Sequence, residues 1–324
     1  MGTQLPLEAF MASMDVAPSR PLTPIPDQIL RFHVEGDRPS TCNGWLFVDA
    51  LGQHAVFGSW KTGSKFVWHQ NGLAMPSYIR AQLREQAKRA KNDMNAPIKA
   101  AARKQVEEIW GAAEPPFQHA YLARKQISGT GARQFGSLLI VPVFNASSRL
   151  LSLQSIDENG NKRFHRGLPI KGGFLLLGPS PKSGAPVLLC EGYATGATLF
   201  EQLGMPVAVA FSATNLLEIG CTLRRLYFNS KLWVCADNDH ATPGNPGLTK
   251  ATTAAHRLQG HLIVPPTSPG ITDFNDLFCL GGKAALLQCF EASPSTNLIR
   301  CQGVTVSQTP ARPDRSTPTI ERNA

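Results

Sequence analysis

The sequence lacks the features that mark a membrane or secreted protein. No run of about 18 uninterrupted apolar residues occurs, and residues 1–20 contain no basic region followed by an apolar core. We therefore expect neither a transmembrane helix nor a secretory signal, no membrane partner, and a cytoplasmic location.

Paired cysteines are also absent. None of the seven cysteines forms the C-x-x-C spacing that is typical of zinc ribbons and thiol redox motifs. Four side chains of ligating types, His33, Cys42, His54 and His69, lie near the N-terminus, but their spacing matches no paired zinc pattern. We expect reduced structural thiols and no zinc.

Acidic residues are scarcer than basic ones. The chain has 23 Asp and Glu against 32 Lys and Arg, which gives a net charge of +9 and a pI near 9.4. This balance favours a polyanionic partner, although charge alone does not separate nucleic acid from an anionic membrane surface.

The chain is long enough for two compact domains at 324 residues and 42% hydrophobic composition. Periodicity and composition divide it into six segments. These are a flexible leader at 1–28, a small β module at 29–75, a basic helical region at 76–114, a basic strand-rich subdomain at 115–185, an α/β domain at 186–290 and a disordered tail at 291–324.

The first half of the chain is expected to combine a small antiparallel sheet with helices. The aromatic side chains Trp45, Trp60 and Trp68 are predicted to pack in a core, with stacking on bases as the alternative. A helix-favouring region follows at 77–113, and Pro97 should break or kink it into two helices. Its basic face is either a solvated surface or a phosphate-binding one.

A basic cluster lies beside a predicted hairpin. Asn159-Gly160 is a strong hairpin signal between two strand-like runs. The basic or imidazole side chains that follow it are Lys162, Arg163, His165, Arg166 and Lys171. The cluster is a candidate anion site, with scattered surface charge as the alternative.

From residue 187 onward, strands alternate with helices. The predicted strands are 187–191, 207–211, 232–236 and 262–264, and the predicted helices are 194–203, 215–226, 248–258 and one from about residue 276. Such alternation predicts a mostly parallel α/β sheet, whose functional groups gather at the carboxyl ends of the strands.

Acidic residues follow these strands. Glu191 ends one strand, Asp237 and Asp239 follow another, and Asp273 and Asp276 follow a third. Clustered carboxylates repel one another unless a cation or proton lies between them, and their hard oxygens favour Mg²⁺ or Mn²⁺ over zinc. Glu191 would be a third ligand or a proton carrier. The alternative is that these acids cap helices or occupy turns.

Three short motifs together resemble a known domain. Glu191-Gly192-Tyr193, Asp237-Asn238-Asp239 and the 273–276 motif are similar to the Toprim domain of bacterial-type primases, topoisomerases and some nucleases. The segment 138–178 resembles the basic subdomain that precedes Toprim in DnaG-type primases. The local sequence around Glu191 and Asp239 most resembles that of primases from conjugative plasmids and related mobile elements.

The resemblance implies a DNA primase, an enzyme that makes short RNA primers on a single-stranded DNA template from ribonucleoside triphosphates. It implies that Glu191, Asp237 and Asp239 are catalytic and bind Mg²⁺ or Mn²⁺, with Asp273 and Asp276 completing the acidic edge. Lys162, Arg163, Arg166 and Lys171 would then hold template or nucleotide phosphates.

Two departures from the family pattern stand out. Thr195 occupies a position where many replicative primases have a further acid, and residues 30–75 lack the cysteine pairs of the usual zinc module. The P-loop pattern G-x-x-x-x-G-K-[S/T] is absent, so a separate replicative helicase is expected. The alternatives are a Toprim-type nuclease and a non-catalytic accessory protein that binds single-stranded DNA.

Overall fold

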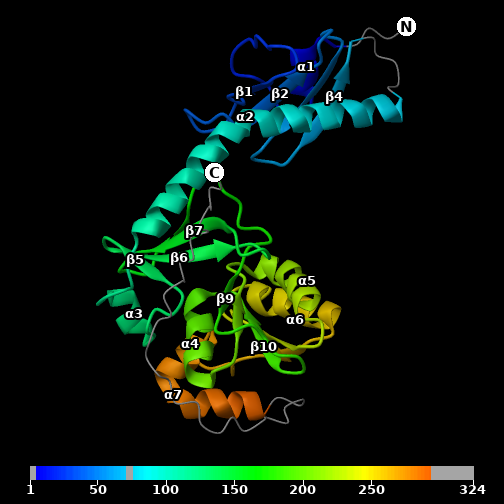
Figure 1. Cartoon of the computed structure of the whole chain (residues 1–324). Coiled ribbons are helices and arrows are strands. Elements are labelled where there is room, and N and C mark those ends of the chain that lie inside the picture. The colour runs from blue at the N-terminus through cyan, green and yellow to red at the C-terminus, as the bar shows by residue number, and fades with distance from the viewer. Residues whose placement is uncertain (1–4, 71–75, 293–324) are drawn as a thin grey trace, which may run out of the picture.

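The structure is a computed structural model that describes residues 5–70 and 76–292. Figure 1 shows a small N-terminal β module and a larger C-terminal unit, with one long helix running from the first to the second. Three sheets of four, five and four strands form the framework. In this described part of the chain, no helix has both the length and the hydrophobicity needed to cross a membrane.

The N-terminal module is a four-stranded antiparallel sheet in the order β1-β2-β3-β4. Its strands are β1 (Ile29–Phe32), β2 (Gly44–Val48), β3 (His54–Ser59) and β4 (Lys65–His69). The predicted core packing of the aromatic residues is confirmed for Trp45 and Trp68, which are buried.

Residues 5–28 differ from the predicted flexible leader. They contain the helix α1 (Leu7–Ser13), and Pro18 forms a β-bridge with Val34. Met11 and Val16 are buried in the core on one face of the sheet. The prediction was wrong because it weighed the prolines and overlooked these two apolar anchors.

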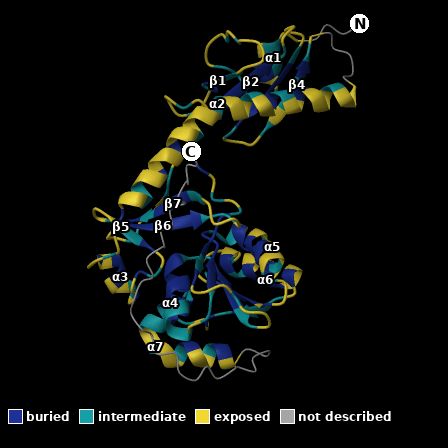
Figure 2. Cartoon of the chain, in the orientation of Figure 1, coloured by how far each residue is buried: buried dark blue, intermediate teal, exposed yellow. Residues whose placement is uncertain are grey.

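The helix α2 (Ser77–Ala112) is continuous over 36 residues, so the predicted division into two helices was wrong, whereas the predicted kink agrees with the course of the helix. Pro97 lacks the N–H that would complete one helical hydrogen bond, but it is exposed and its ring needs no room in a core. Leu83 anchors the first half in the N-terminal module, and Val106 anchors the second half in the C-terminal unit. Figure 1 shows that α2 changes direction about halfway along, and Figure 2 shows it exposed over most of its length.

A second antiparallel sheet, in the order β5-β6-β7-β8, starts the C-terminal unit. Its strands are β5 (Arg133–Phe135), β6 (Leu138–Phe144), β7 (Leu150–Ile156) and β8 (Lys162–Phe164), and the short helix α3 (Ala120–Lys125) precedes them. One face of this sheet carries Ile140 and Leu153 and packs on α2. The other face carries Leu139 and Val141 and packs in the large central core.

The third sheet has the strand order β13-β12-β10-β11-β9 and is parallel except for β9. The strands are β9 (Leu175–Leu177), β10 (Pro186–Cys190), β11 (Val207–Val209), β12 (Lys231–Cys235) and β13 (His261–Ile263). The helices are α4 (Tyr193–Leu203), α5 (Leu216–Leu226), α6 (Pro246–Leu258) and α7 (Phe274–Glu291), with the 3₁₀ turn η1 (Ala213–Asn215) before α5. The pair α4 and α7 covers one face, and the pair α5 and α6 covers the other.

The predicted mostly parallel α/β domain with a basic subdomain and an N-terminal β module before it is confirmed. One assignment needs correction. The run 172–177 was placed in the basic subdomain, but β9 pairs with β11 and therefore belongs to the third sheet. The predicted tail lies outside the described residues from 293 onward, and α7 continues to Glu291.

Candidate active site

The acidic residues lie at the carboxyl ends of two neighbouring strands whose following helices cover opposite faces of the sheet. The adjacent parallel strands β10 and β12 send their chains to helices on opposite faces, α4 after β10 and α6 after β12. A crevice forms at the carboxyl ends of two such strands. Glu191 follows β10 directly, and Asp237 lies two residues beyond the end of β12.

Asp237 is the most perturbed carboxyl group of this edge. Burial, and then the negative charges of Asp273, Glu191 and Asp239, raise the pKa of Asp237 to about 8, while Lys162 opposes the shift. Its Oδ1 atom is shielded from solvent and has no hydrogen-bond partner among the residues that the structure describes. Buried polar atoms are rarely left unpaired, so this oxygen is suited to bind a cation or to accept a hydrogen bond.

Glu191 belongs to the same group of charges. Burial is the main cause of its raised pKa, Asp239 adds repulsion, and the Ala213 N–H and Lys162 act in the opposite direction. The Glu191 carbonyl also accepts a hydrogen bond of 2.8 Å from the Phe211 N–H. The loop after β11 therefore fixes both the backbone and the carboxylate of Glu191.

The loop after β12 is held by the residue between the two aspartates. Asn238 is buried, donates to the Pro265 carbonyl at 3.2 Å and to Thr267 Oγ1 at 3.1 Å, and accepts from Asn245 Nδ2 at 2.8 Å. The strand itself ends at Cys235, and beyond it the side-chain hydrogen bonds of Asn238 hold the loop in place.

Close contact with α6 then sets the position of Asp239. A Cβ atom on Gly247 would lie 2.8 Å from Asp239 Oδ2 and 2.8 Å from the Asp237 carbonyl oxygen. Only glycine leaves room for the first turn of α6 to lie against both aspartates.

The last two acids have structural partners. Asp273 caps α7 by accepting from the Asp276 N–H at 2.8 Å. Asp276 accepts from the Thr272 N–H and hydroxyl and forms an ion pair with Lys125 at 3.2 Å. The capping role that the sequence analysis kept as an alternative is thus present at Asp273, and both oxygens of Asp276 are already occupied.

The chemistry of this edge suits a hard cation. Asp237 Oδ1 lacks a partner, and its neighbours are oxygen ligands of the kind that Mg²⁺ and Mn²⁺ bind. Within residues 5–70 and 76–292, no three His, Cys, Asp or Glu side chains lie close enough together to hold an ion by themselves.

The predicted basic residues do not act as one group. Lys162 stands opposite Ile156 in the β7–β8 register, whereas Arg163 stands opposite Ser155, so the two side chains project from opposite faces of the sheet. Ile156 lies in the central core, so Lys162 is on the face toward the acidic edge. Its effect on the pKa values of Glu191 and Asp237 agrees with this placement.

Two other predicted basic residues have separate surroundings. Lys171 pairs with Glu218 of α5 at 3.5 Å. Arg166 is exposed in the loop after β8, where its carbonyl contacts His165 Nδ1 at 3.0 Å. Of the predicted anion-binding set, only Lys162 interacts with the carboxylates.

One residue that the sequence did not single out joins the segment between β8 and β9 to the third sheet. Asn215 is buried, accepts from the Gly172 N–H at 3.0 Å and donates at 2.9 Å to the carbonyls of Gly173 and Ala210. Asparagine before a helix is an ordinary capping signal, so nothing in the sequence distinguished it. The aromatic contact between Phe164 of β8 and Phe211, with ring centroids 6.0 Å apart, reinforces the same junction.

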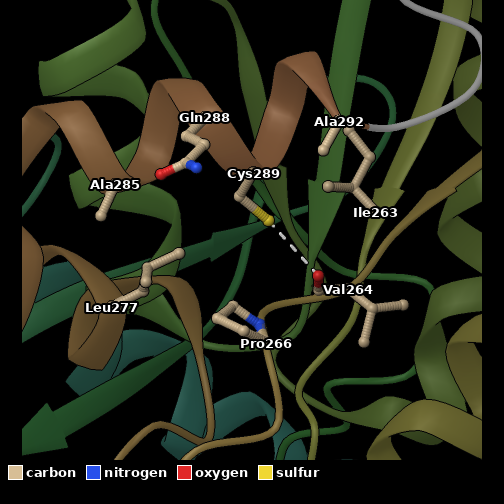
Figure 3. A pocket seen from close by; sticks show the side chains of 8 residues that line it. All are labelled: Ile263, Val264, Pro266, Leu277, Ala285, Gln288, Cys289 and Ala292. Carbon is tan, nitrogen blue, oxygen red and sulfur yellow. Dashed lines mark hydrogen bonds between the residues drawn. The ribbon is translucent and has the colours of Figure 1, made fainter.

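A pocket of about 450 Å³ lies elsewhere, between α7 and the segment after β13 (Figure 3). Its lining is largely apolar, with Gln288 and Cys289 as polar members, and Cys289 Sγ contacts the Val264 carbonyl at 3.3 Å. The lining contains no carboxylate or basic side chain, so this pocket is distinct from the acidic edge.

Comparison with known families gives a match for the segment that contains most of the third sheet. Residues 186–284 match the Toprim domain. The chain contains a Toprim domain. The matched range includes Glu191, Asp237 and Asp239, and the fold predicted for this segment is confirmed.

The similarity to curated proteins extends beyond residues 186–284. Two proteins of Escherichia coli named DNA primase TraC are each 29% identical, over 258 and 255 residues. The matches cover 74% of this chain but only 24% and 18% of those relatives, so the chain spans a quarter or less of their length. The predicted similarity to Toprim-domain primases is confirmed.

Among solved structures, the primase fragment of the bacteriophage T7 primase-helicase protein has a TM-score of 0.39 and 13% sequence identity. That match covers 55% of this chain and 80% of the fragment.

Proposed function

We propose that the chain is the catalytic part of a DNA primase, which synthesises short RNA primers on single-stranded DNA by metal-dependent nucleotidyl transfer. The observation that carries the proposal is the buried Oδ1 atom of Asp237, which has no hydrogen-bond partner among the described residues and whose carboxyl group is under the negative charges of Asp273, Glu191 and Asp239. The similarity to proteins named DNA primase selects this activity among the chemistries of the Toprim domain.

We assign Asp237, Asp239 and Glu191 to holding Mg²⁺ or Mn²⁺. When bound, the cation supplies charge neutralisation at the triphosphate and a lowered pKa of the attacking ribose 3′-hydroxyl. Asp273 adds negative charge to the site while it caps α7. Asp276 positions the start of α7 through Thr272 and Lys125, so we assign it a supporting role and not that of a direct ligand.

Lys162 provides positive charge opposite the acids. It projects from β8 toward the edge where the carboxylates lie, and it stabilises the ionised forms of Glu191 and Asp237. A side chain in this position can hold a nucleotide phosphate against the cation site. We assign Arg163, Arg166 and Lys171 to binding the phosphate backbone of the template. This attraction depends less on exact geometry than the binding of a nucleotide phosphate at the cation site does.

The direct test is primer synthesis on unprimed single-stranded DNA with labelled ribonucleotides and Mg²⁺ or Mn²⁺. We expect labelled oligomers from the wild-type chain and none from Asp237→Asn or Asp239→Asn, with DNA binding retained in both variants. Absence of product over a range of templates and both metals would refute the proposal.

The same reaction separates the two alternatives. A nuclease that uses these acids would shorten end-labelled DNA without any nucleoside triphosphate. An accessory protein would form no labelled oligomer, and it would bind DNA with the same affinity in the wild-type and Glu191→Gln forms, with or without the metal.

We further propose that the primers serve a plasmid or mobile element in replication or conjugative transfer, and that a separate replicative helicase opens the template. The similarity to TraC supports the first point. A pull-down of candidate helicases with the purified chain tests the second.

A further inference from the structure

The N-terminal module carries a group of basic side chains far along α2 from the acidic edge. Its members are Arg31, Lys65, Arg84, Lys88 and Lys91, all exposed, and we refer to them as the cationic face. They come from the two edge strands of the sheet and from the first half of α2.

Strand register brings the two outer members to one side of the sheet. Arg31 stands opposite Trp45, Trp45 opposite Gly58, and Gly58 opposite Lys65. Residues that stand directly opposite share a face, and Trp45 packs in the core that α2 covers. Arg31 and Lys65 therefore project on the α2 side, from opposite edges of the sheet and about 14 Å apart at the usual strand spacing of about 4.8 Å.

The helix supplies the remaining charges. Arg84, Lys88 and Lys91 are spaced by four and three residues, so they form a stripe on one side of α2. This stripe lies one position beyond the buried residues Leu83 and Ala87, which places it along the margin of the sheet.

The members of the cationic face repel one another. The pKa of Lys65 lies below its ordinary value, first because partial burial disfavours the charged form and then because Arg84 and Lys91 are near. Glu85 pairs with Lys88 at 3.5 Å and with Arg89 at 3.9 Å. Across the described residues, Arg31, Lys65, Arg84 and Lys91 have no acidic partner at ion-pair distance.

Part of the cationic face is held in place. The Arg31 guanidinium lies 4.8 Å from the centre of the Trp60 ring, and Lys91 Nζ lies 5.2 Å from it. Arg31 Nη2 also donates to the Cys42 carbonyl at 2.7 Å. Cations fixed on an aromatic ring lose less conformational freedom when they bind an anion than cations on free side chains do.

We propose that the cationic face is a second nucleic-acid site, which binds the phosphate backbone of single-stranded DNA. Four of its five cations, all except Lys88, have no acidic partner at ion-pair distance among the described residues, and such a row of positive charges complements a polyanion with regularly spaced charges. The choice of single-stranded DNA as the ligand rests on the proposed function, because a primase uses a single-stranded template. The row of positive charges is observed independently of that function.

The test is DNA binding measured without metal or nucleotides, so a failure of primer synthesis cannot affect it. The variant is Lys65→Glu/Arg84→Glu/Lys91→Glu, and the matched control is Lys182→Glu/Lys250→Glu/Arg257→Glu, which changes the net charge equally on the C-terminal unit. We expect a labelled 30-nucleotide strand to bind the first variant at least about 10-fold more weakly than wild type and the control less than about 3-fold more weakly. The salt slope of log K should fall in magnitude by about 2 in the first variant, because each lost phosphate contact contributes about 0.7.

A second variant without any charge change tests the same site in case the charge-reversal variant unfolds. Trp60→Leu keeps an apolar side chain in place but removes the ring that holds Arg31 and Lys91, and it should weaken binding about 2- to 5-fold. Equal binding by the two charge variants would overturn the site. Equal losses for duplex DNA, or for vesicles with anionic lipids, would overturn the assignment to a single strand.

Discussion

Asp237 is the residue whose charge state depends most on what else occupies the acidic edge. In the metal-free protein its pKa of about 8 exceeds the ordinary value of 3.8, so the folded chain keeps a proton there that the unfolded chain loses as the pH rises above about 4. Stability contributed by this proton is present at low pH and is lost as the pH rises toward 8.

Asp237→Asn should therefore stabilise the metal-free protein increasingly as the pH rises. We expect the melting temperatures of wild type and variant, measured with a chelator, to be close at pH 5 and to differ by several degrees in favour of the variant at pH 8. Added Mg²⁺ should raise the melting temperature of the wild type alone. A difference that stays constant with pH would show that Asp237 titrates normally.

Lys162 and Arg163 form a natural matched pair, because they are neighbours in sequence but project from opposite faces of β8. Lys162→Ala removes the positive charge that faces Glu191 and Asp237, and we expect it to lower kcat/KM for primer synthesis about 10- to 100-fold. Arg163→Ala should lower it less than about 3-fold. Equal effects in the kinetic assay would mean that the register does not determine their roles.

At the scale of elements, the junction of α6 with the loop after β12 is the most restrictive contact. Gly247→Ala adds a methyl group 2.8 Å from both Asp239 Oδ2 and the Asp237 carbonyl, so the carboxylate or the helix must move. We expect primer synthesis to fall at least about 10-fold even though alanine favours a helix by about 1 kcal/mol.

The control for this substitution is Gly111→Ala, at a helical position in α2 with open space around the new methyl group. It should raise the free energy of unfolding by about 0.5–1 kcal/mol and leave activity unchanged. Unchanged activity in Gly247→Ala would show that the contact with Asp239 can relax.

The elements that sequence predicts well are those whose periodicity is set by burial. The small antiparallel sheet of the N-terminal module and the alternation of strands and helices after residue 186 follow from apolar spacing, and the structure contains both. Long-range partners are what sequence does not supply. The pairing of β9 with β11, and the hydrogen bonds of Asn215, join residues whose proximity appears only after the chain has folded.

The same distinction applies to the acidic edge. Glu191 and Asp237 were predictable because each follows a buried strand in a parallel sheet. The Lys125 ion pair that engages Asp276 was not, because it joins positions 151 residues apart.

At the scale of the whole molecule, α2 joins two separate cores, and Pro97 lies between them. Pro97→Ala restores one helical hydrogen bond and should raise the free energy of unfolding by about 1–3 kcal/mol. The helix should also straighten, which small-angle X-ray scattering would detect as a larger radius of gyration. Lower stability in the variant would show that the bend is required by packing on both sides.

The length of α2 also sets a scale for the nucleic acid. A helix of 36 residues is about 54 Å long, which corresponds to roughly 16 nucleotides at the spacing of about 3.4 Å that one strand has in a duplex. A strand that reaches both the cationic face and the acidic edge gains avidity, because binding at one end raises the effective concentration of the other. A strand of 6 nucleotides can occupy one end at a time, so affinity should rise in a step as the strand becomes long enough to bridge the two.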